Sequence, residues 1–473
     1  MHFRGGFNPR ISGHKGNPLP LVRWRQDFTG EGKTQMPSSL RRVSRLSVLL
    51  ASSILISSFA LSPARAATET ITVWTDSGND DQPLLEALAK AFEIANPNIH
   101  VTVDVGPRGV EAVDLVKSRL AAGTMDDVFV YYSGSLLQAL NPTKNLVDLA
   151  REPWQSKVVS SYWPAISIGE HKFGSPFGSA MGGGILYNKL VYKKLGLKIP
   201  LTWSQFMANN AKIKKAGLIP VISTYKDSWT AQLLVLADEF NVQAVSPNFP
   251  AMFTANKASI AKTPAAMAGF QHLEQVHKAG YQNKDFATAD LATGLKYLAT
   301  GKGAHYPMLS FVASDLEKSY PKLAGNVGIF AQPGNSAKQN GLTVWMPNGL
   351  FISKTTTQLD AAKKFVAFSM TSEGFDAMTS AVAPTGPYLI KGAKLPGRLS
   401  QITVEMLPYL NAEGRTAPAL EFVSPIKGPN LPAITVQVGS GKKSAAQGAL
   451  AYDVDVKKES KRLGLPGWGD LPG

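Results

Sequence analysis

Soon after residue 70, apolar residues are spaced first as in a strand, then as in a helix, and then again as in a strand. Residues 71–74 form a short β-branched and aromatic run, and residues 99–105 alternate apolar with polar side chains, so both segments predict strands. Between them, Leu84, Leu88 and Phe92 recur at four-residue spacing, which predicts a helix with one apolar face.

The same order then continues for one more helix and strand. Val113, Val116 and Leu120 share one face of a second predicted helix, which ends at Gly123, and residues 128–132 are typical of a buried strand. A strand–helix–strand–helix–strand order indicates an α/β fold built on a parallel sheet.

The remaining chain continues this mixture without a fixed-period repeat. A run of three glycines at 182–184 precedes the next predicted strand. Further strands are predicted over 185–187, 306–311, 327–331 and 349–352, and helices near 189–195, 203–215, 229–239, 264–279, 293–300 and 360–369.

The N-terminal region has the order of a secretory signal. Three arginines at 41, 42 and 45 precede an apolar stretch at 46–61, and small residues follow at 64–66. Five serines interrupt the stretch, which makes it too short and too polar for a membrane anchor. We expect residues 1–66 to be leader and signal peptide, with the start at Met36 and cleavage after Ala66.

The net charge and the cysteine content limit the partners and the kinds of site that the protein can have. The formal net charge is +15, but residues 1–66 hold ten Lys/Arg and only two acidic residues, so much of the excess belongs to the predicted leader and a nucleic-acid partner is not expected. The chain has no Cys, which excludes disulfides, thiolate metal sites and lipid attachment at the cleavage site. A secreted, soluble periplasmic protein is expected.

Several segments, in this order, resemble the extracellular solute-binding proteins of family 1, the group that contains maltose-binding protein. They are ITVW at 71–74, LAKAFE at 88–93, NPNI at 96–99, LAAG at 120–123, DVF at 127–129, KFGSPF at 172–177, LYNK at 186–189, TWSQF at 202–206, NGLFISK at 348–354, AAKKF at 361–365 and TSE at 371–373. The chain departs from the family pattern after Pro176 and at 309–311, where a ligand would be contacted.

The resemblance implies a two-lobed periplasmic-binding-protein (Venus flytrap) fold, in which each lobe is a mostly parallel sheet flanked by helices. The N-terminal lobe would comprise 67–177 plus 305–370, and the C-terminal lobe 178–304 plus 371–473. It also implies a monomeric substrate-binding subunit of an ABC importer, which captures a sugar or small oligosaccharide and delivers it to permease subunits in the inner membrane. No enzymatic activity and no cofactor are implied.

Candidate ligand-binding residues follow from strand ends and from the resemblance. In α/β sheets ligands bind outside the carboxyl ends of strands, which selects polar and aromatic residues after the first and third strands. Asp80 and Asp81 are instead expected to cap a helix. The candidates are Asp76, Ser77, Asn79, Tyr131, Ser133, Ser179, Trp229, Phe311, Trp345, Asn348, Tyr388 and Arg415.

Two alternatives stay open at this point. The same fold could bind a polyamine through Asp76, Asp80, Asp81 and Asp227, or ferric iron through Tyr131 and Tyr132. A secreted glycoside hydrolase would need two carboxylates in one cleft, and no local motif selects such a pair. Aromatic side chains near the predicted cleft favour a sugar, whose C–H face stacks on rings.

Overall fold

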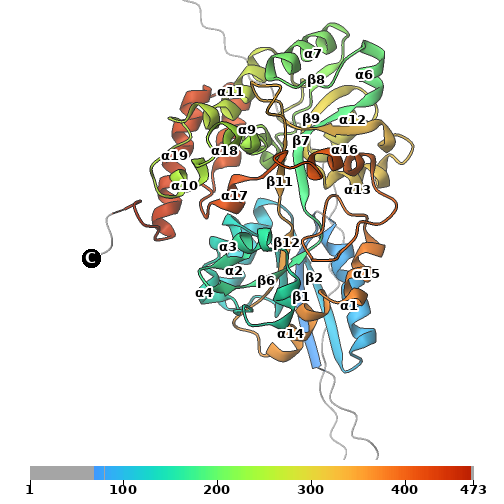
Figure 1. Ribbon diagram of the computed structural model, residues 1–473, viewed down its shortest axis with the longest axis vertical. Coiled ribbons are helices and arrows are strands. Elements are labelled where there is room, and N and C mark those ends of the chain that lie inside the picture. The colour runs from blue at the N-terminus through green and yellow to red at the C-terminus, as the bar shows by residue number, and fades with distance from the viewer. Residues whose placement is uncertain (1–68, 79, 470–473) are drawn as a thin grey trace, which may run out of the picture. The chain divides into compact units, whose positions relative to one another are not determined.

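The computed structural model describes residues 69–78 and 80–469 and contains two large β-sheets, each flanked by helices, and one two-stranded hairpin (Figure 1). The predicted α/β class is confirmed. The predicted leader over 1–66, with its start at Met36 and its cleavage site after Ala66, lies outside the described residues. Within 69–78 and 80–469, no helix combines the length and the apolar character needed to cross a membrane.

The first sheet has five strands in the order β2–β1–β3–β12–β6. β1 runs parallel to β2 and β3, whereas β12 runs antiparallel to β3 and β6, so the sheet is mixed rather than mostly parallel. Its strands are β1 (Glu69–Asp76), β2 (Ile99–Gly106), β3 (Val128–Tyr131), β6 (Gly174–Phe177) and β12 (Asn348–Ile352).

The helices beside this sheet bury the apolar faces that the periodicity predicts. On α1, Leu84, Leu88 and Phe92 are all buried, and the Phe92 ring lies 5.1 Å from that of Phe365 on α14. The helices of this half are α1 (Asp81–Ala95), α2 (Val110–Ala122), α3 (Ser135–Gln138), α4 (Pro142–Asn145), α5 (Trp163–Ile166), α14 (Leu359–Phe368) and α15 (Ser372–Ala381), with 3₁₀ turns at Pro153–Lys157 and Ser160–Tyr162 and a hairpin of β4 (Ser167–Ile168) and β5 (His171–Lys172).

The second sheet is organised around β7, which runs antiparallel to β9, β10 and β11. β8 and β13 add parallel neighbours to β9 and β11, so this sheet is also mixed. Its strands are β7 (Met181–Asn188), β8 (Ile219–Val221), β9 (Gly303–Leu309), β10 (Val327–Phe330), β11 (Leu342–Trp345) and β13 (Thr416–Pro418).

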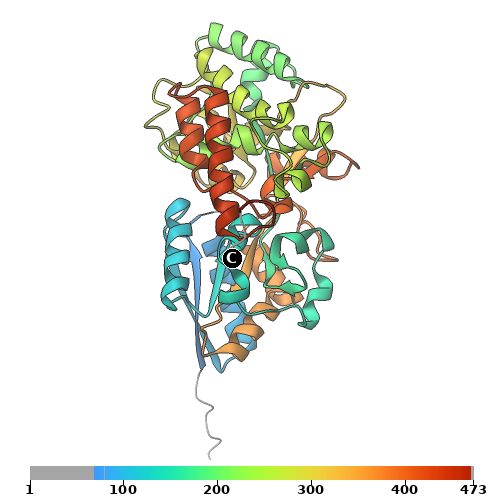
Figure 2. The same cartoon turned by 90° about the vertical axis from the view of Figure 1, so that its left-hand side faces the viewer.

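Twelve helices lie with this second sheet in the described part of the chain. The longest, α19, extends toward the first half (Figure 2), where Arg462 Nη2 donates to Ala139 O at 3.4 Å. They are α6 (Lys189–Leu195), α7 (Trp203–Lys215), α8 (Leu233–Leu236), α9 (Glu239–Val245), α10 (Phe249–Thr254), α11 (Pro264–Lys278), α12 (Leu291–Ala299), α13 (Val312–Ser319), α16 (Gln401–Leu410), α17 (Leu420–Val423), α18 (Leu431–Gly439) and α19 (Ala445–Arg462), with 3₁₀ turns at Ser228–Gln232 (η3) and Ala324–Asn326 (η4).

The structure contradicts part of the predicted lobe division. The boundary at 177/178 falls between β6 and β7, where the chain passes from one sheet to the other. The boundary at 305 is wrong, because β9, β10 and β11 all pair within the second sheet and not the first. The boundary at 371 is also wrong, since α15 packs against α1 of the first half.

Buried acids in the second half predict a loss of stability at alkaline pH. Burial raises the pKa of Glu239 to about 8, so the folded protein binds this proton more tightly than the unfolded chain does. The stability linked to this proton is complete below pH 4.5, the pKa of an ordinary glutamate, and is lost as the pH rises through 8. Glu239→Gln keeps an acceptor for Gln243 Nε2 and removes the ionisation. It should raise the free energy of unfolding at pH 9 by about 3 kcal/mol.

Urea unfolding at pH 5 and pH 9 measures this effect. The exposed Glu413→Gln provides the control and should change stability little at either pH. An equal gain from Glu239→Gln at both pH values would contradict the assignment to ionisation.

Candidate functional site

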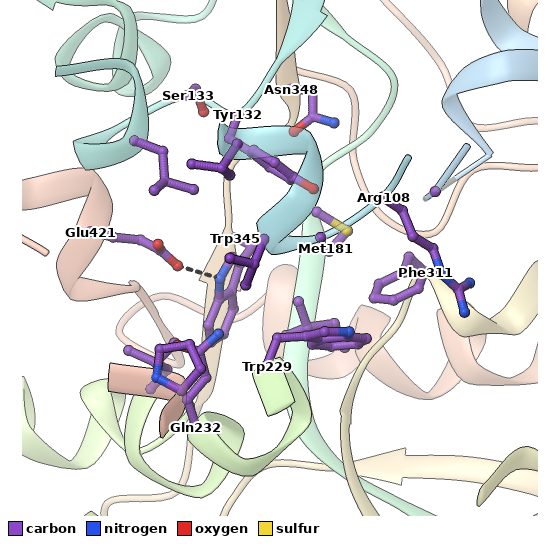
Figure 3. Close-up of a pocket in the computed structure, with 18 of the residues that line it drawn as sticks. Arg108, Tyr132, Ser133, Met181, Trp229, Gln232, Phe311, Trp345, Asn348 and Glu421 are labelled. Carbon is purple, nitrogen blue, oxygen red and sulfur yellow. Dashed lines mark hydrogen bonds between the residues drawn. The ribbon is translucent and has the colours of Figure 1, made fainter. Parts of the chain in front are cut away.

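A cavity of about 430 Å³ lies where loops of the first sheet meet the second half of the chain (Figure 3). This volume falls within the ordinary range for small-molecule sites, about 300–1,000 Å³. The first half contributes the segments that follow β1, β2 and β3, and the second half contributes η3 and the ends of β9 and β11.

Aromatic side chains form much of the cavity wall. Trp229 comes from η3 and Phe311 follows β9, and their ring centroids lie 6.0 Å apart at an interplanar angle of 39°. Tyr132 faces them from the first half, and Trp345 closes one side (Figure 3). Flat apolar rings of this kind contact the C–H surfaces of a ligand well.

Trp345 is the most enclosed of these rings, with 6% of its surface exposed. Its indole Nε1 donates to Glu421 Oε1 at 2.7 Å, and the second oxygen of Glu421 forms an ion pair with Lys427. Glu421 and Lys427 come from α17 and the segment after it, so a late part of the chain fixes this wall.

Two buried aspartates lie behind the cavity on the side of the first sheet. Tyr132 Oη donates to Asp76 Oδ2 at 3.0 Å, and Asn348 Nδ2 donates to Asp81 Oδ2 at 2.7 Å. Burial raises the pKa of Asp76, and burial together with the neighbouring Asp76 raises the pKa of Asp81 well above its ordinary value. The pair therefore retains a proton more readily than two exposed aspartates would, and it orients Tyr132 and Asn348.

Charged side chains line the edge of the cavity. Lys318 on α13 and Asp80 before α1 form an ion pair at 2.6 Å between the two halves. Arg108, after β2, extends along the same side (Figure 3). Asp80 precedes the first residue of α1, as predicted for a cap, but its side chain makes no capping hydrogen bond.

Two polar atoms in the wall have no hydrogen-bond partner among the described residues. They are Oε1 of Gln232 on η3 and Oγ of Ser135 on α3, and both are buried. Because a buried polar atom without a partner costs free energy, both residues hold unused hydrogen-bonding capacity next to the cavity.

The structure brings most of the predicted residues together. Ser77, Ser133, Trp229, Phe311, Trp345 and Asn348 line the main cavity. Ser179 and Tyr388 line a smaller adjoining pocket that Phe311 and Asn348 also border. Asp76 lies behind Tyr132 and acts on the cavity through that residue.

Two predicted residues lie elsewhere and a third is not described. Tyr131 is 2% exposed and faces the core, because neighbouring side chains at the end of β3 point to opposite sides and Tyr132 takes the cavity side. Arg415 packs over the Tyr409 ring and donates to Asn340 O at 2.7 Å, and it does not line the cavity. Asn79 lies outside the described residues.

The sequence interpretation missed several lining residues. Tyr132 could have been selected from the same tyrosine pair, had the alternation been resolved. No local motif marks the others, since they reach the cavity only through tertiary packing. They include Arg108, Met181, Gln232, Glu421, Phe422 and Lys427.

Comparison with known proteins gives consistent matches over most of the chain. The family model described as "Bacterial extracellular solute-binding protein" matches residues 75–374. The multiple sugar-binding protein of Streptococcus mutans is 25% identical over 358 residues, which cover 73% of this chain and 83% of that protein.

Solved structures share the fold at low sequence identity. A chitin oligosaccharide binding protein superposes with a TM-score of 0.70 at 19% identity, covering 83% of this chain and 100% of that one. The solute-binding protein RafE in complex with raffinose superposes with a TM-score of 0.68 at 22% identity, covering 81% of this chain and 98% of that one.

Proposed function

The chain belongs to the family of bacterial extracellular solute-binding proteins, and from this premise we propose that it captures a sugar or short oligosaccharide in the aromatic-lined cavity. It acts as the substrate-binding subunit of an ABC importer and delivers the sugar to permease subunits in the inner membrane. It is a binding protein rather than an enzyme, exported to the periplasm as a monomer without a lipid anchor.

The composition of the cavity wall carries the proposal. Aromatic side chains of the wall, among them Tyr132, Trp229, Phe311 and Trp345, offer ring surface to the C–H faces of a pyranose. Gln232 Oε1 and Ser135 Oγ, which lack hydrogen-bond partners among the described residues, turn toward the sugar and pair with its hydroxyl groups. A polyamine carries several positive charges and calls for several acidic groups that are not neutralised. The acids that line this cavity are accompanied by four basic side chains, and Lys318 and Lys427 pair with two of them, so the site suits a carbohydrate better.

The topology supports a mechanism in which two lobes close on the ligand. We place 69–177 and 348–381 in the first lobe and 181–345 and 401–469 in the second, following the sheets and the helices beside them. The sugar contacts both lobes, so it stabilises the conformation in which they are close. The Asp80–Lys318 ion pair contributes to the same conformation.

Calorimetric titration of the purified protein tests the ligand class. We expect heat of binding with at least one member of a panel of mono- and oligosaccharides, and none with spermidine or ferric citrate. Binding of spermidine or ferric citrate, with no response to any sugar, would overturn the carbohydrate proposal.

A further inference from the structure

The Trp345 indole is held at its edge by two charged side chains that do not belong to its own strand. Its N–H donates to Glu421 Oε1 at 2.7 Å, and Glu421 is itself 6% exposed. The other oxygen of Glu421 pairs with Lys427, whose side chain is 14% exposed. A buried hydrogen bond to a charged acceptor is stronger than one between neutral groups, and it restricts the position of the donor more.

The six-membered ring of the same indole, on the side remote from the N–H, packs against backbone. A Cβ atom on Gly183 of β7 would lie 2.1 Å from Trp345 Cζ3, so the ring packs directly on the glycine. The ring therefore has little freedom to rotate toward β7, and the Glu421 hydrogen bond prevents rotation in the ring plane.

The two charged residues that hold the indole N–H lie outside the part of the chain that the family model matches. That match ends at residue 374, whereas Glu421 is on α17 and Lys427 follows it. The arrangement is thus a feature of this chain's C-terminal region, and the family assignment does not supply it.

We propose that Glu421, locked by Lys427, is a positioning residue that fixes the Trp345 indole as a rigid wall of the ligand cavity. This inference rests on the proposed sugar-binding function. Because Glu421 occupies the indole N–H, Trp345 offers the ligand ring surface only and no hydrogen bond. The cavity keeps its shape before the ligand arrives, which lowers the ordering cost of binding.

The test compares two substitutions of Glu421 with a matched control. Glu421→Leu removes both the acceptor and the charge, whereas Glu421→Gln keeps an acceptor oxygen for the indole. The exposed Glu413→Leu is the control. We expect Glu421→Leu to weaken sugar binding about tenfold or more, Glu421→Gln to restore most of the loss, and Glu413→Leu to have no effect.

A second readout follows the ring itself in the ligand-free protein. Selective ¹⁵N labelling of tryptophan resolves the indole N–H signals, and Trp345→Phe identifies the one from Trp345. In Glu421→Leu this signal should move and its hydrogen exchange should accelerate, while in Glu421→Gln the exchange should stay slow.

The two readouts separate failure of this inference from failure of the proposed function. An unchanged Trp345 signal in Glu421→Leu overturns the positioning role, as does a changed signal with unchanged sugar affinity. If the unmodified protein binds no sugar, the proposed function fails, and the indole signal alone then decides whether Glu421 holds the ring.

Discussion

Replacement of Trp229 by alanine is expected to lower the affinity for the sugar about 100-fold, because it removes a central aromatic contact. Trp229 lies on η3 next to Phe311, and Tyr132 lies on the opposite side of the cavity (Figure 3). The ring is only partly buried, so the free energy of unfolding should fall by about 1 kcal/mol. Calorimetric titration and urea unfolding measure the two quantities on the same preparation.

A partly buried aromatic residue of the same half provides the control. Tyr281 lies under Lys214 and does not line the cavity. Tyr281→Ala should leave the affinity unchanged, whatever it costs in stability. A loss of affinity of the same size in both variants would show that the effect of Trp229→Ala comes from general destabilisation and not from a lost ligand contact.

The first half of the fold could be predicted from the sequence because the spacing of apolar residues within short segments specifies its strands and helices. Residues 71–131 alternate strand and helix periods in chain order, and β1, β2 and β3 pair in parallel as that order requires. The predicted boundary at 305 failed for a different reason. β9, β10 and β11 all pair with β7, more than 100 residues earlier in the chain, and no local pattern specifies such antiparallel partners.

Some residues of the candidate site could likewise be predicted from local sequence, and others are defined only by tertiary packing. Strand ends and turn residues predict Ser77 and Ser133, because parallel strands gather their carboxyl ends at one edge. Asn348 is predicted with Trp345 from the segment before the late strand, and it reaches the same edge as the first residue of β12, which runs antiparallel to β3. The family resemblance favours Tyr131, but Tyr132 lines the cavity, because a shift of one residue at a strand end reverses the side that a side chain faces. Glu421 carries no signal in the sequence, since a carboxylate that holds an indole N–H is defined only by the packing of α17 against β11.

Gly183→Ala is expected to damage both stability and binding, because the added methyl group meets the Trp345 ring. The new Cβ would lie 2.1 Å from Cζ3, and 2.9 Å from Cε3 and Cη2, so the ring must move from its place in the cavity wall. That movement breaks the hydrogen bond to Glu421 and reduces the space for the ligand. We expect the free energy of unfolding to fall by about 1–3 kcal/mol and the affinity to fall about tenfold or more.

The neighbouring Gly182 separates the two effects, because its side of β7 faces away from Trp345. A Cβ there would lie 2.6 Å from Leu342 Cδ2 and 3.0 Å from Met406 Cε, both ends of flexible side chains. Gly182→Ala should therefore lower stability by about 1 kcal/mol and leave the affinity unchanged. Urea unfolding and calorimetric titration of both variants check the contrast. Equal losses of affinity would mean that strain anywhere in β7 disturbs the cavity, and that the contact between Gly183 and Trp345 has no special role.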